Sequence, residues 1–237
     1  MCIAHYYNPD RLVYLNQVVY NFLSYDIKVD IIINTNSKNL TSLCSKNVAI
    51  YIPKNLPHPY FLTWLHRACM LDLINEYDYF LYTEDDLLLP FENFVEYLKN
   101  FELLFPKYVP SFVRIEKIDG KNIVVDVQKK QNKNNIINYL NKQFISLDRP
   151  YHGFWIMPQK QLKETMTDNF IEVCTTDMSR EYAASYPMWT LKKTPLVMIE
   201  NGQISPLCYS YHLPNTYSLK KEIHHKFGRL EIENLID

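Results

Sequence analysis

Glycine is scarce in this chain of 237 residues, and its scarcity excludes two common ways of binding phosphate. The four glycines are Gly120, Gly153, Gly202 and Gly228. They are too far apart to form a G-x-G-x-x-G dinucleotide fingerprint or a phosphate loop of the Walker type. A phosphate group bound by this chain must therefore be held by a metal ion or by side chains.

The sequence also lacks an excess of basic residues, paired cysteine motifs and long apolar runs. Its net charge is −1, which argues against a nucleic-acid binder that depends on a strong positive field. The five cysteines form no C-x-x-C pair, as expected for reduced thiols in a cytosol-like compartment. There is no signal peptide and no run of about 18 apolar residues. We therefore expect a cytoplasmic protein without a membrane span.

The hydrophobic content of 47% is sufficient for one α/β domain with a sizeable core. Residues Cys2 to Tyr7 and Val29 to Ile33 have the composition of strands. Between them Asn8 and Pro9 predict the start of a helix, with Asn8 as the N-cap. Strand, helix and strand form a βαβ unit, whose crossover is expected to be right-handed. Val48 to Ile52 predicts a third strand.

Three consecutive acids, Glu84, Asp85 and Asp86, follow the apolar segment Tyr79–Tyr82 and precede a second apolar run that ends at Pro90. The first segment is typical of a strand buried on both faces of a parallel sheet. Three neighbouring carboxylates repel one another and are costly to bury unless a cation neutralises them. Mg²⁺ and Mn²⁺ take carboxylate oxygens, and open α/β sheets bind ligands beyond the carboxyl ends of their strands. We predict a divalent metal site; a solvated acidic turn is the alternative.

A hydrophobic strand that ends in Glu-Asp-Asp resembles the DXD element of GT-A-fold glycosyltransferases, in the variant whose first acid is Glu. The resemblance implies a central mixed, mostly parallel sheet flanked by helices. It implies a single catalytic domain over residues 1–237, with a nucleotide-binding half at 1–90 and an acceptor-side half at 91–237.

In that family the last acid of the motif holds the metal that bridges the diphosphate of a nucleotide sugar. If the resemblance holds for this sequence, Asp86 takes that role and binds Mn²⁺ or Mg²⁺. The two preceding acids lie near the ribose and the sugar in these enzymes, so Glu84 and Asp85 would face those groups of the donor.

Further donor contacts are implied by the ends of the early strands, against which GT-A enzymes place the nucleotide. Tyr6 and Arg11 follow the first strand and Thr35 follows the second; loop and capping roles are the alternative. Arg67 lies in a predicted helix from Tyr60 to Glu76, where such enzymes often carry a basic residue near the donor. An exposed helical arginine is the alternative there.

Gly153 interrupts an aromatic segment that begins at Tyr151, and a lone glycine in a strand suggests close approach of a ligand or of another backbone. In the GT-A family a strand of small residues in this position lines the donor sugar and the acceptor. The resemblance therefore adds Gly153 to the candidate donor site.

Asp177 and Glu181 are four residues apart in a predicted helix, so both carboxylates project from one face. Either could be the general base that takes a proton from an acceptor hydroxyl, a role that contributes about 10²–10⁴ in rate. Because Asp177 can cap the helix, we favour Glu181; pairing of Glu181 with Arg180 or a lysine is the alternative. His212 follows a late strand, where several GT-A enzymes supply a second metal ligand, although a lone histidine is more often structural.

The remaining segments complete the predicted fold. An amphipathic helix is expected at Phe91–Phe105, and the strand Val109–Glu116 is expected to form a hairpin with Asn122–Val127. The polar segment Lys129–Lys142 predicts a mobile loop. A terminal helix is expected between Leu219 and Asp237.

The resemblance and these residues together imply transfer of a sugar from a nucleotide sugar, expected to be a UDP-sugar, to a hydroxyl of a glycan or another acceptor. A metal-dependent nucleotidyltransferase is the first alternative, but a Gly- and Lys/Arg-rich loop after the first strand is missing. A metal-dependent nuclease is disfavoured because Glu116 and Lys117 have the wrong spacing. A non-catalytic glycan- or nucleotide-binding module stays open.

Overall fold

The computed structural model describes two compact units of the chain. Unit 1 comprises Met1–Asp86 and His152–Lys192, and unit 2 comprises Leu87–Tyr151 and Lys193–Asp237. The described residues are 1–56, 58–147, 153–166, 180–220, 222 and 227–237. The boundary after Asp86 lies near the predicted division at residue 90, but the chain returns to unit 1 for a second segment. No helix in the described ranges is long and apolar enough to cross a membrane.

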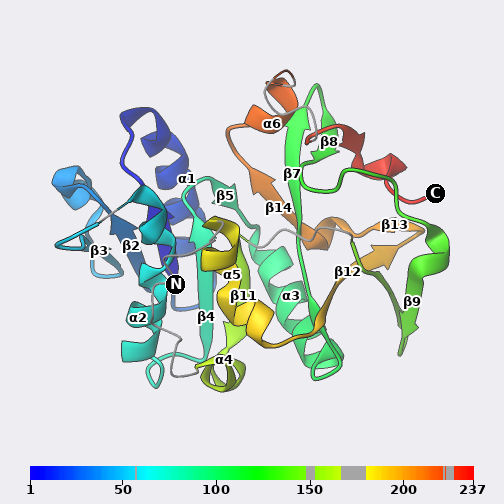
Figure 1. Ribbon diagram of the computed structural model, residues 1–237, viewed down its shortest axis with the longest axis horizontal. Helices are drawn as coiled ribbons and strands as arrows, with labels where there is room; N and C mark the ends of the chain where they lie inside the picture. The colour runs from blue at the N-terminus through cyan, green and yellow to red at the C-terminus, as the bar shows by residue number, and fades with distance from the viewer. Residues whose placement is uncertain (57, 148–152, 167–179, 221, 223–226) are drawn as a thin grey trace. The chain divides into compact units, whose positions relative to one another are not determined.

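A five-stranded sheet in the order β11-β4-β1-β2-β3 is the framework of unit 1 (Figure 1). Four of its strands are parallel, and β11 is antiparallel to β4. The strands are β1 (Cys2–His5), β2 (Ile31–Thr35), β3 (Val48–Tyr51), β4 (Tyr79–Glu84) and β11 (Trp155–Pro158). The predicted fold class, a mixed and mostly parallel sheet flanked by helices, is confirmed. The carboxyl ends of β1, β2 and β4 therefore share one edge of the sheet.

The helical segments of unit 1 begin close to the predicted positions. They are η1 (Pro9–Arg11), α1 (Leu12–Leu23), η2 (Lys38–Leu43), η3 (Pro59–Thr63), α2 (Leu65–Asp72), α4 (Gln159–Thr165) and α5 (Arg180–Thr190). The cap at Asn8 is confirmed, since its Oδ1 accepts a hydrogen bond from the Asp10 amide at 3.0 Å, but it starts the short 3-10 turn η1 before α1. The single helix predicted after Pro59 is in fact η3 followed by the shorter α2.

Both faces of the unit 1 sheet are apolar, which explains why its strands have nearly continuous apolar sequences. One face packs against side chains of η3, α2, α4 and α5, among them Leu62, Met70, Leu162 and Ala184. Its strand residues are Cys2, Ala4, Phe80, Tyr82, Trp155 and Met157. Because successive side chains alternate between faces, Ile3 and its partner Ile33 lie on the opposite face.

Unit 2 is built from two further sheets. One has the order β13-β12-β10-β9 with β6 beside β12, and the other has the order β15-β8-β7-β14-β5. The strands are β5 (Leu87–Leu88), β6 (Tyr108–Pro110), β7 (Val113–Ile118), β8 (Lys121–Val124), β9 (Ile136–Tyr139), β10 (Lys142–Ile145), β12 (Thr194–Glu200), β13 (Gln203–Ile204), β14 (Tyr209–His212) and β15 (Leu230–Glu231). The helical segments are α3 (Phe91–Leu104), η4 (Lys133–Asn135), η5 (Pro206–Cys208), α6 (Thr216–Leu219) and η6 (Ile232–Asn234).

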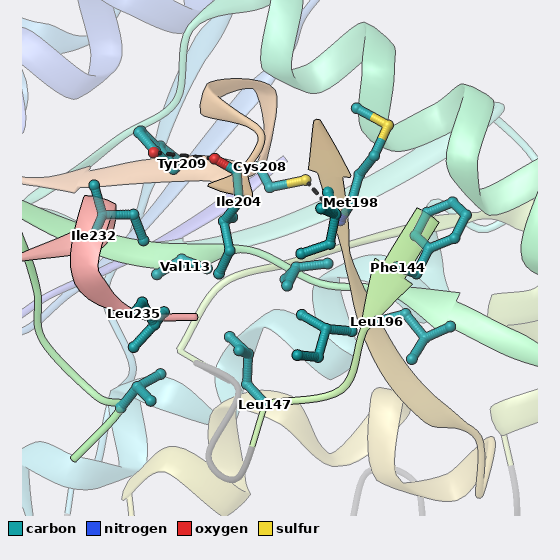
Figure 2. Close-up of a cluster of buried hydrophobic side chains, with 14 of the residues drawn as sticks. Val113, Phe144, Leu147, Leu196, Met198, Ile204, Cys208, Tyr209, Ile232 and Leu235 are labelled. Atoms are coloured by element: carbon teal, nitrogen blue, oxygen red, sulfur yellow. Dashed lines mark hydrogen bonds between the residues drawn. The ribbon is translucent and has the colours of Figure 1, made fainter. Parts of the chain in front are cut away.

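Unit 2 has a hydrophobic core of its own, shown in Figure 2. Side chains from β7, β10, β12 and β13 meet there with Ile232 and Leu235 from the end of the chain. Two hydrogen bonds order its polar atoms: the Tyr209 hydroxyl donates to the Ile204 carbonyl at 3.2 Å, and the Met198 amide donates to Cys208 Sγ at 3.4 Å (Figure 2). Burial raises the pKa of the Cys208 thiol to about 12, so this cysteine stays protonated.

Two sequence predictions for unit 2 are wrong. The loop expected at Lys129–Lys142 contains β9, which pairs with β10 and packs Ile136, Ile137 and Tyr139 against the core. The terminal helix expected between Leu219 and Asp237 is also wrong: beyond α6 the described part of this segment contains the strand β15, which pairs with β8, and the short 3-10 turn η6. In both segments, sheet pairing and burial of a few apolar side chains outweigh the polar composition. The hairpin of β7 and β8 is confirmed.

Candidate functional site

The acid triplet lies at the carboxyl edge of the unit 1 sheet. Glu84 ends β4, beside Ala4 of β1, and Asp85 and Asp86 follow it. Asp85 and Asp86 are only 3% and 4% exposed. The alternative of a solvated acidic turn is therefore wrong for these two residues, and their charges need partners inside the protein.

Arg11 and His5 supply those partners. The Arg11 guanidinium donates through Nη2 to Asp85 and to Asp86 Oδ2, the latter at 2.8 Å, and through Nε to Asp85 Oδ2 at 3.3 Å. His5 Nδ1 is hydrogen-bonded to Asp85 Oδ2. Partial burial lowers the pKa of Arg11, but both carboxylates raise it more, and the net shift is upward. We call His5, Arg11, Asp85 and Asp86 the acid cluster.

The sequence analysis singled out Arg11, Asp85 and Asp86 as candidate site residues, but it did not predict that they pair with one another. Arg11 was predicted to contact the donor, and the acids were predicted to need a metal ion. The signal that could have joined them is the topology: β1 and β4 are adjacent parallel strands, so residues that follow both strands meet at one edge.

The other predicted donor contacts of the early strands differ in accessibility. Tyr6 directly follows β1 and is 51% exposed. Thr35 ends β2 beside His5 and is fully buried. Its hydroxyl has no hydrogen-bond partner among the described residues. Tyr6 can thus reach a ligand without any rearrangement, whereas the fully buried Thr35 is not accessible to a ligand in this structure.

Arg67 is buried in α2 rather than exposed on it. Its Nη2 donates to the Ala183 carbonyl at 2.7 Å, and its guanidinium carbon lies 4.1 Å from the Trp64 ring centroid and 4.4 Å from that of Tyr186. The alternative of an exposed helical arginine is wrong. These contacts join α2 to α5, so Arg67 contributes to the packing of unit 1.

His66, beside Arg67, is fully buried against the strand that carries the acids. Its ring centroid lies 4.4 Å from that of Tyr82 in β4 and 5.6 Å from that of Trp155 in β11. Burial, and then the charge of Arg67, lower the pKa of His66 well below its ordinary value of 6.5. His66 is therefore neutral in the folded chain at neutral pH.

This burial predicts a loss of stability in weak acid. Well above pH 6.5, the ordinary pKa of histidine, His66 is neutral in both the folded and the unfolded chain. As the pH falls through 6.5, the unfolded chain binds a proton at His66 that the folded chain does not bind. The free energy of unfolding therefore falls. Between pH 6.5 and 5.5 the loss from His66 is at most about 1 kcal/mol, the limit for a histidine that binds no proton in the folded state. Urea unfolding at several pH values should show that His66→Phe removes this part of the pH dependence. His58→Asn, which replaces an exposed histidine cap, should keep it; equal slopes for the wild type and His66→Phe would contradict the prediction.

The helix predicted to carry Asp177 and Glu181 is only partly within the described residues. The helix is present from Arg180 onward, and Glu181 lies in the first turn of α5. Asp177 lies outside the described residues. Gly153 is buried and precedes β11, the strand next to β4.

His212, the predicted second metal ligand, belongs to a buried polar pair in unit 2. Its Nδ1 lies 2.6 Å from Glu116 Oε1, and Glu116 also accepts hydrogen bonds from the amides of Tyr217 at 3.1 Å and Ser218 at 2.6 Å. Burial by itself raises the pKa of Glu116, but the hydrogen bonds from His212 and Ser218 outweigh it and hold the pKa below its ordinary value. A carboxylate bonded to one ring nitrogen is also the usual support of a metal-binding histidine.

Whether the acid cluster suits a metal ion depends on Arg11. Carboxylate oxygens are the donors that Mn²⁺ and Mg²⁺ take, so the chemistry of Asp85 and Asp86 fits. In the described ranges, however, no group of three or more His, Cys, Asp or Glu side chains is arranged to hold a metal ion. Asp86 Oδ2, a potential ligand atom, already accepts a hydrogen bond from Arg11.

Several solved structures are similar to the chain in their fold. One is TarS 1–349 of S. aureus, with 12% identity, a TM-score of 0.49 and a match to 94% of this chain, which spans 63% of the length of that structure. A second is 4-diphosphocytidyl-2C-methyl-D-erythritol synthase, with 12% identity, a TM-score of 0.42 and coverage of 79% of this chain and 85% of the other.

A third is the corresponding synthase from Anaerococcus prevotii, with 9% identity, a TM-score of 0.41 and coverage of 82% and 83%. No family model and no curated protein matches the chain. At these identities and TM-scores, the likenesses assign neither a family nor an activity.

Proposed function

We propose that the chain is a metal-dependent glycosyltransferase of the GT-A type, which moves a sugar from a nucleotide sugar, in our view a UDP-sugar, to a hydroxyl of a glycan or another acceptor. The observation that supports this most is the acid cluster, two buried carboxylates and a partly exposed arginine at the carboxyl edge of a mostly parallel sheet. Ligands of open α/β sheets bind at this edge.

The residues at the carboxyl edge of the unit 1 sheet match the chemical groups of a nucleotide sugar and its metal ion. Asp86 would hold Mn²⁺ or Mg²⁺, which when bound stabilises negative charge on the leaving diphosphate. Arg11 carries a fixed positive charge that can bind phosphate oxygens in a bidentate manner. The exposed ring of Tyr6 offers a flat apolar surface to the base or ribose. Glu84 and Asp85 would lie toward the sugar and ribose.

The acceptor side of the proposal rests on carboxylates and a histidine elsewhere in the chain. Glu181, or Asp177, would take the proton of the acceptor hydroxyl. His212, in unit 2, would serve as a metal ligand, and its bond to Glu116 Oε1 would fix which ring nitrogen carries the proton.

The test is thermal unfolding with nucleoside diphosphates, nucleotide sugars and nucleoside triphosphates, each with and without Mn²⁺. We expect one diphosphate and its sugar conjugate to raise the melting temperature only when the metal is present. A ligand at one hundred times its Kd stabilises the native state by about 2.7 kcal/mol. A shift confined to triphosphates would indicate nucleotidyl transfer instead, and no shift with any compound would refute donor binding.

A further inference from the structure

Two cysteines of unit 1 meet at the end of the sheet opposite to the acid cluster. Cys2 begins β1, and its side chain lies on the sheet face that α2 covers. Cys69 of α2 packs against the same apolar cluster. A hydrogen bond joins the two thiols. The sequence gave no sign of this contact, because the two cysteines are far apart in the chain and belong to no spaced motif.

The two thiols differ in burial but border the same cavity. Cys2 is 2% exposed, whereas Cys69 is only partly buried. Both line a cavity of about 600 Å³, whose walls include apolar side chains from the first residues of β2, β3 and β4. A small uncharged oxidant such as a hydroperoxide can therefore reach the sulfur of Cys69 while unit 1 stays folded.

The contact between the thiols makes Cys69 the more reactive of the two. The hydrogen bond from Cys2 outweighs partial burial and the charge of Asp72, and it lowers the pKa of Cys69. The same hydrogen bond, and then burial, raise the pKa of Cys2 well above its ordinary value. Because the thiolate is the nucleophile in thiol chemistry, Cys69 should react first and Cys2 second.

Asn34 of β2 is a second polar neighbour of Cys69. The Cys69 thiol donates to Asn34 Oδ1, with 3.8 Å between sulfur and oxygen. Asn34 is fully buried, and its Nδ2 has no hydrogen-bond partner among the described residues. A side-chain amide offers an acceptor on one side and two donors on the other. A flip of the Asn34 amide would therefore turn a donor toward Cys69 once that sulfur is ionised.

We propose that Cys2 and Cys69 are an oxidisable thiol pair, in which a hydroperoxide converts Cys69 to a sulfenic acid and Cys2 then closes a disulfide between β1 and α2. This arrangement, a partly accessible thiol beside a second thiol that can displace the sulfenic acid, is the usual one for redox-sensing cysteines. It agrees with reduced thiols in a cytosol-like compartment, where disulfides are transient. The proposal does not depend on the proposed sugar transfer.

Both steps balance with the hydroperoxide as the sole oxidant. In the first step the Cys69 thiolate attacks one peroxide oxygen, the O–O bond breaks, and the other oxygen takes up a proton and leaves as an alcohol or as water. In the second step the sulfur of Cys2 attacks the sulfenic sulfur and the S–O bond breaks. The hydroxide that leaves takes the proton of Cys2 and becomes water. The two thiols are thereby oxidised and the peroxide is reduced, and a dithiol reverses the change by exchange.

The experiment counts free thiols in the denatured full-length chain before and after treatment of the reduced, folded protein with a small excess of hydrogen peroxide. The wild type should lose two of its five thiols, and dithiothreitol should restore both. Mass spectrometry of peptides from a non-reducing digest should show Cys2 linked to Cys69. Cys44→Ser, which removes an exposed thiol of unit 1, is the matched control and should also lose two thiols.

The order of the two steps is tested with single variants and dimedone, a reagent that traps sulfenic acids. Cys2→Ser should accumulate the trapped sulfenic acid on Cys69, because the thiol that would displace it is missing. Cys69→Ser should keep Cys2 as a thiol under the same conditions. Circular dichroism shows whether these two variants are folded, and the disulfide map of the wild type does not depend on either of them.

Two kinds of result would overturn the proposal. If Cys2 and Cys69 stay thiols while Cys44 is oxidised, or if either of them is linked to a different cysteine, they are not a pair and act only as small apolar side chains in the core. If dimedone labels Cys2 in Cys69→Ser as fast as it labels Cys69 in Cys2→Ser, Cys69 is not the thiol that peroxide attacks first.

Discussion

Replacement of Asp86 with alanine is expected to lower sugar transfer at least about 100-fold, because a metal ion that acts as a Lewis acid contributes several kcal/mol to the transition state. Release of the nucleoside diphosphate from the donor identified by thermal unfolding is the measurement. The substitution should leave unit 1 folded, since Arg11 retains its bonds to Asp85 through Nε and Nη2.

Asp78→Ala is the matched control for this prediction. Asp78 directly precedes β4, so it flanks the same strand at the opposite end, and it is exposed. We expect normal turnover and an unchanged metal requirement for this variant. Turnover by Asp86→Ala at the rate of Asp78→Ala would remove Asp86 from the proposed mechanism, provided that both proteins have wild-type circular dichroism spectra.

The features that were predictable from the sequence are those that depend on near neighbours in the chain. The apolar segment before Glu84 predicted β4, and its lack of alternation predicted burial on both faces, because a central parallel strand has helices on each side. Asn8 and Pro9 predicted where the first helical segment begins. The same local patterns placed the acids at the carboxyl end of a central strand, which is the main element of the candidate site.

The pairing of Arg11 with Asp85 and Asp86 was not predictable in this way. Arg11 and Asp85 are 74 positions apart, and nothing in their local patterns indicates that β4 lies beside β1 rather than at the sheet margin. The charge argument correctly required a counter-ion for the acids, but a metal and an arginine satisfy it equally well. Only the strand order, which places the end of β1 beside the end of β4, shows that Arg11 is near enough to pair with these acids.

Burial of Arg67 was missed for a related reason. A cationic residue in a short helix is usually exposed, and the partners of Arg67 include a carbonyl group and two aromatic rings. Such partners carry no charge, so charge patterning in the sequence gives no sign of them. The strand β9 (Ile136–Tyr139) was missed because its few inward-packing apolar side chains lie in a mostly polar stretch of sequence.

Replacement of Trp155 with alanine is expected to lower the free energy of unfolding by about 3–5 kcal/mol, the usual range for a large aromatic residue truncated in a core. Trp155 lies in β11 beside β4, is 1% exposed, and donates its indole N–H to the Ala184 carbonyl at 2.7 Å. The truncation leaves a cavity beside Tyr82 and His66, which are its ring neighbours, and removes the donor to a buried carbonyl. Because the cavity adjoins the strand that carries the acids, the melting shift produced by metal and nucleotide should also become smaller.

Trp189→Ala is the control against which the loss of stability in Trp155→Ala is compared. Trp189 is in α5, is 47% exposed, and also makes an indole hydrogen bond, to Ser185 Oγ at 2.9 Å. Both variants lose a tryptophan side chain and the indole hydrogen bond described here, and Trp155 is far more buried than Trp189. We therefore expect the larger loss for Trp155→Ala. Urea unfolding followed by circular dichroism should give a loss below about 1 kcal/mol for Trp189→Ala. Equal losses for the two variants would mean that Trp155 is not part of a packed core, and the placement of β11 against β4 would then be wrong, along with the burial of the acid-bearing strand that depends on it.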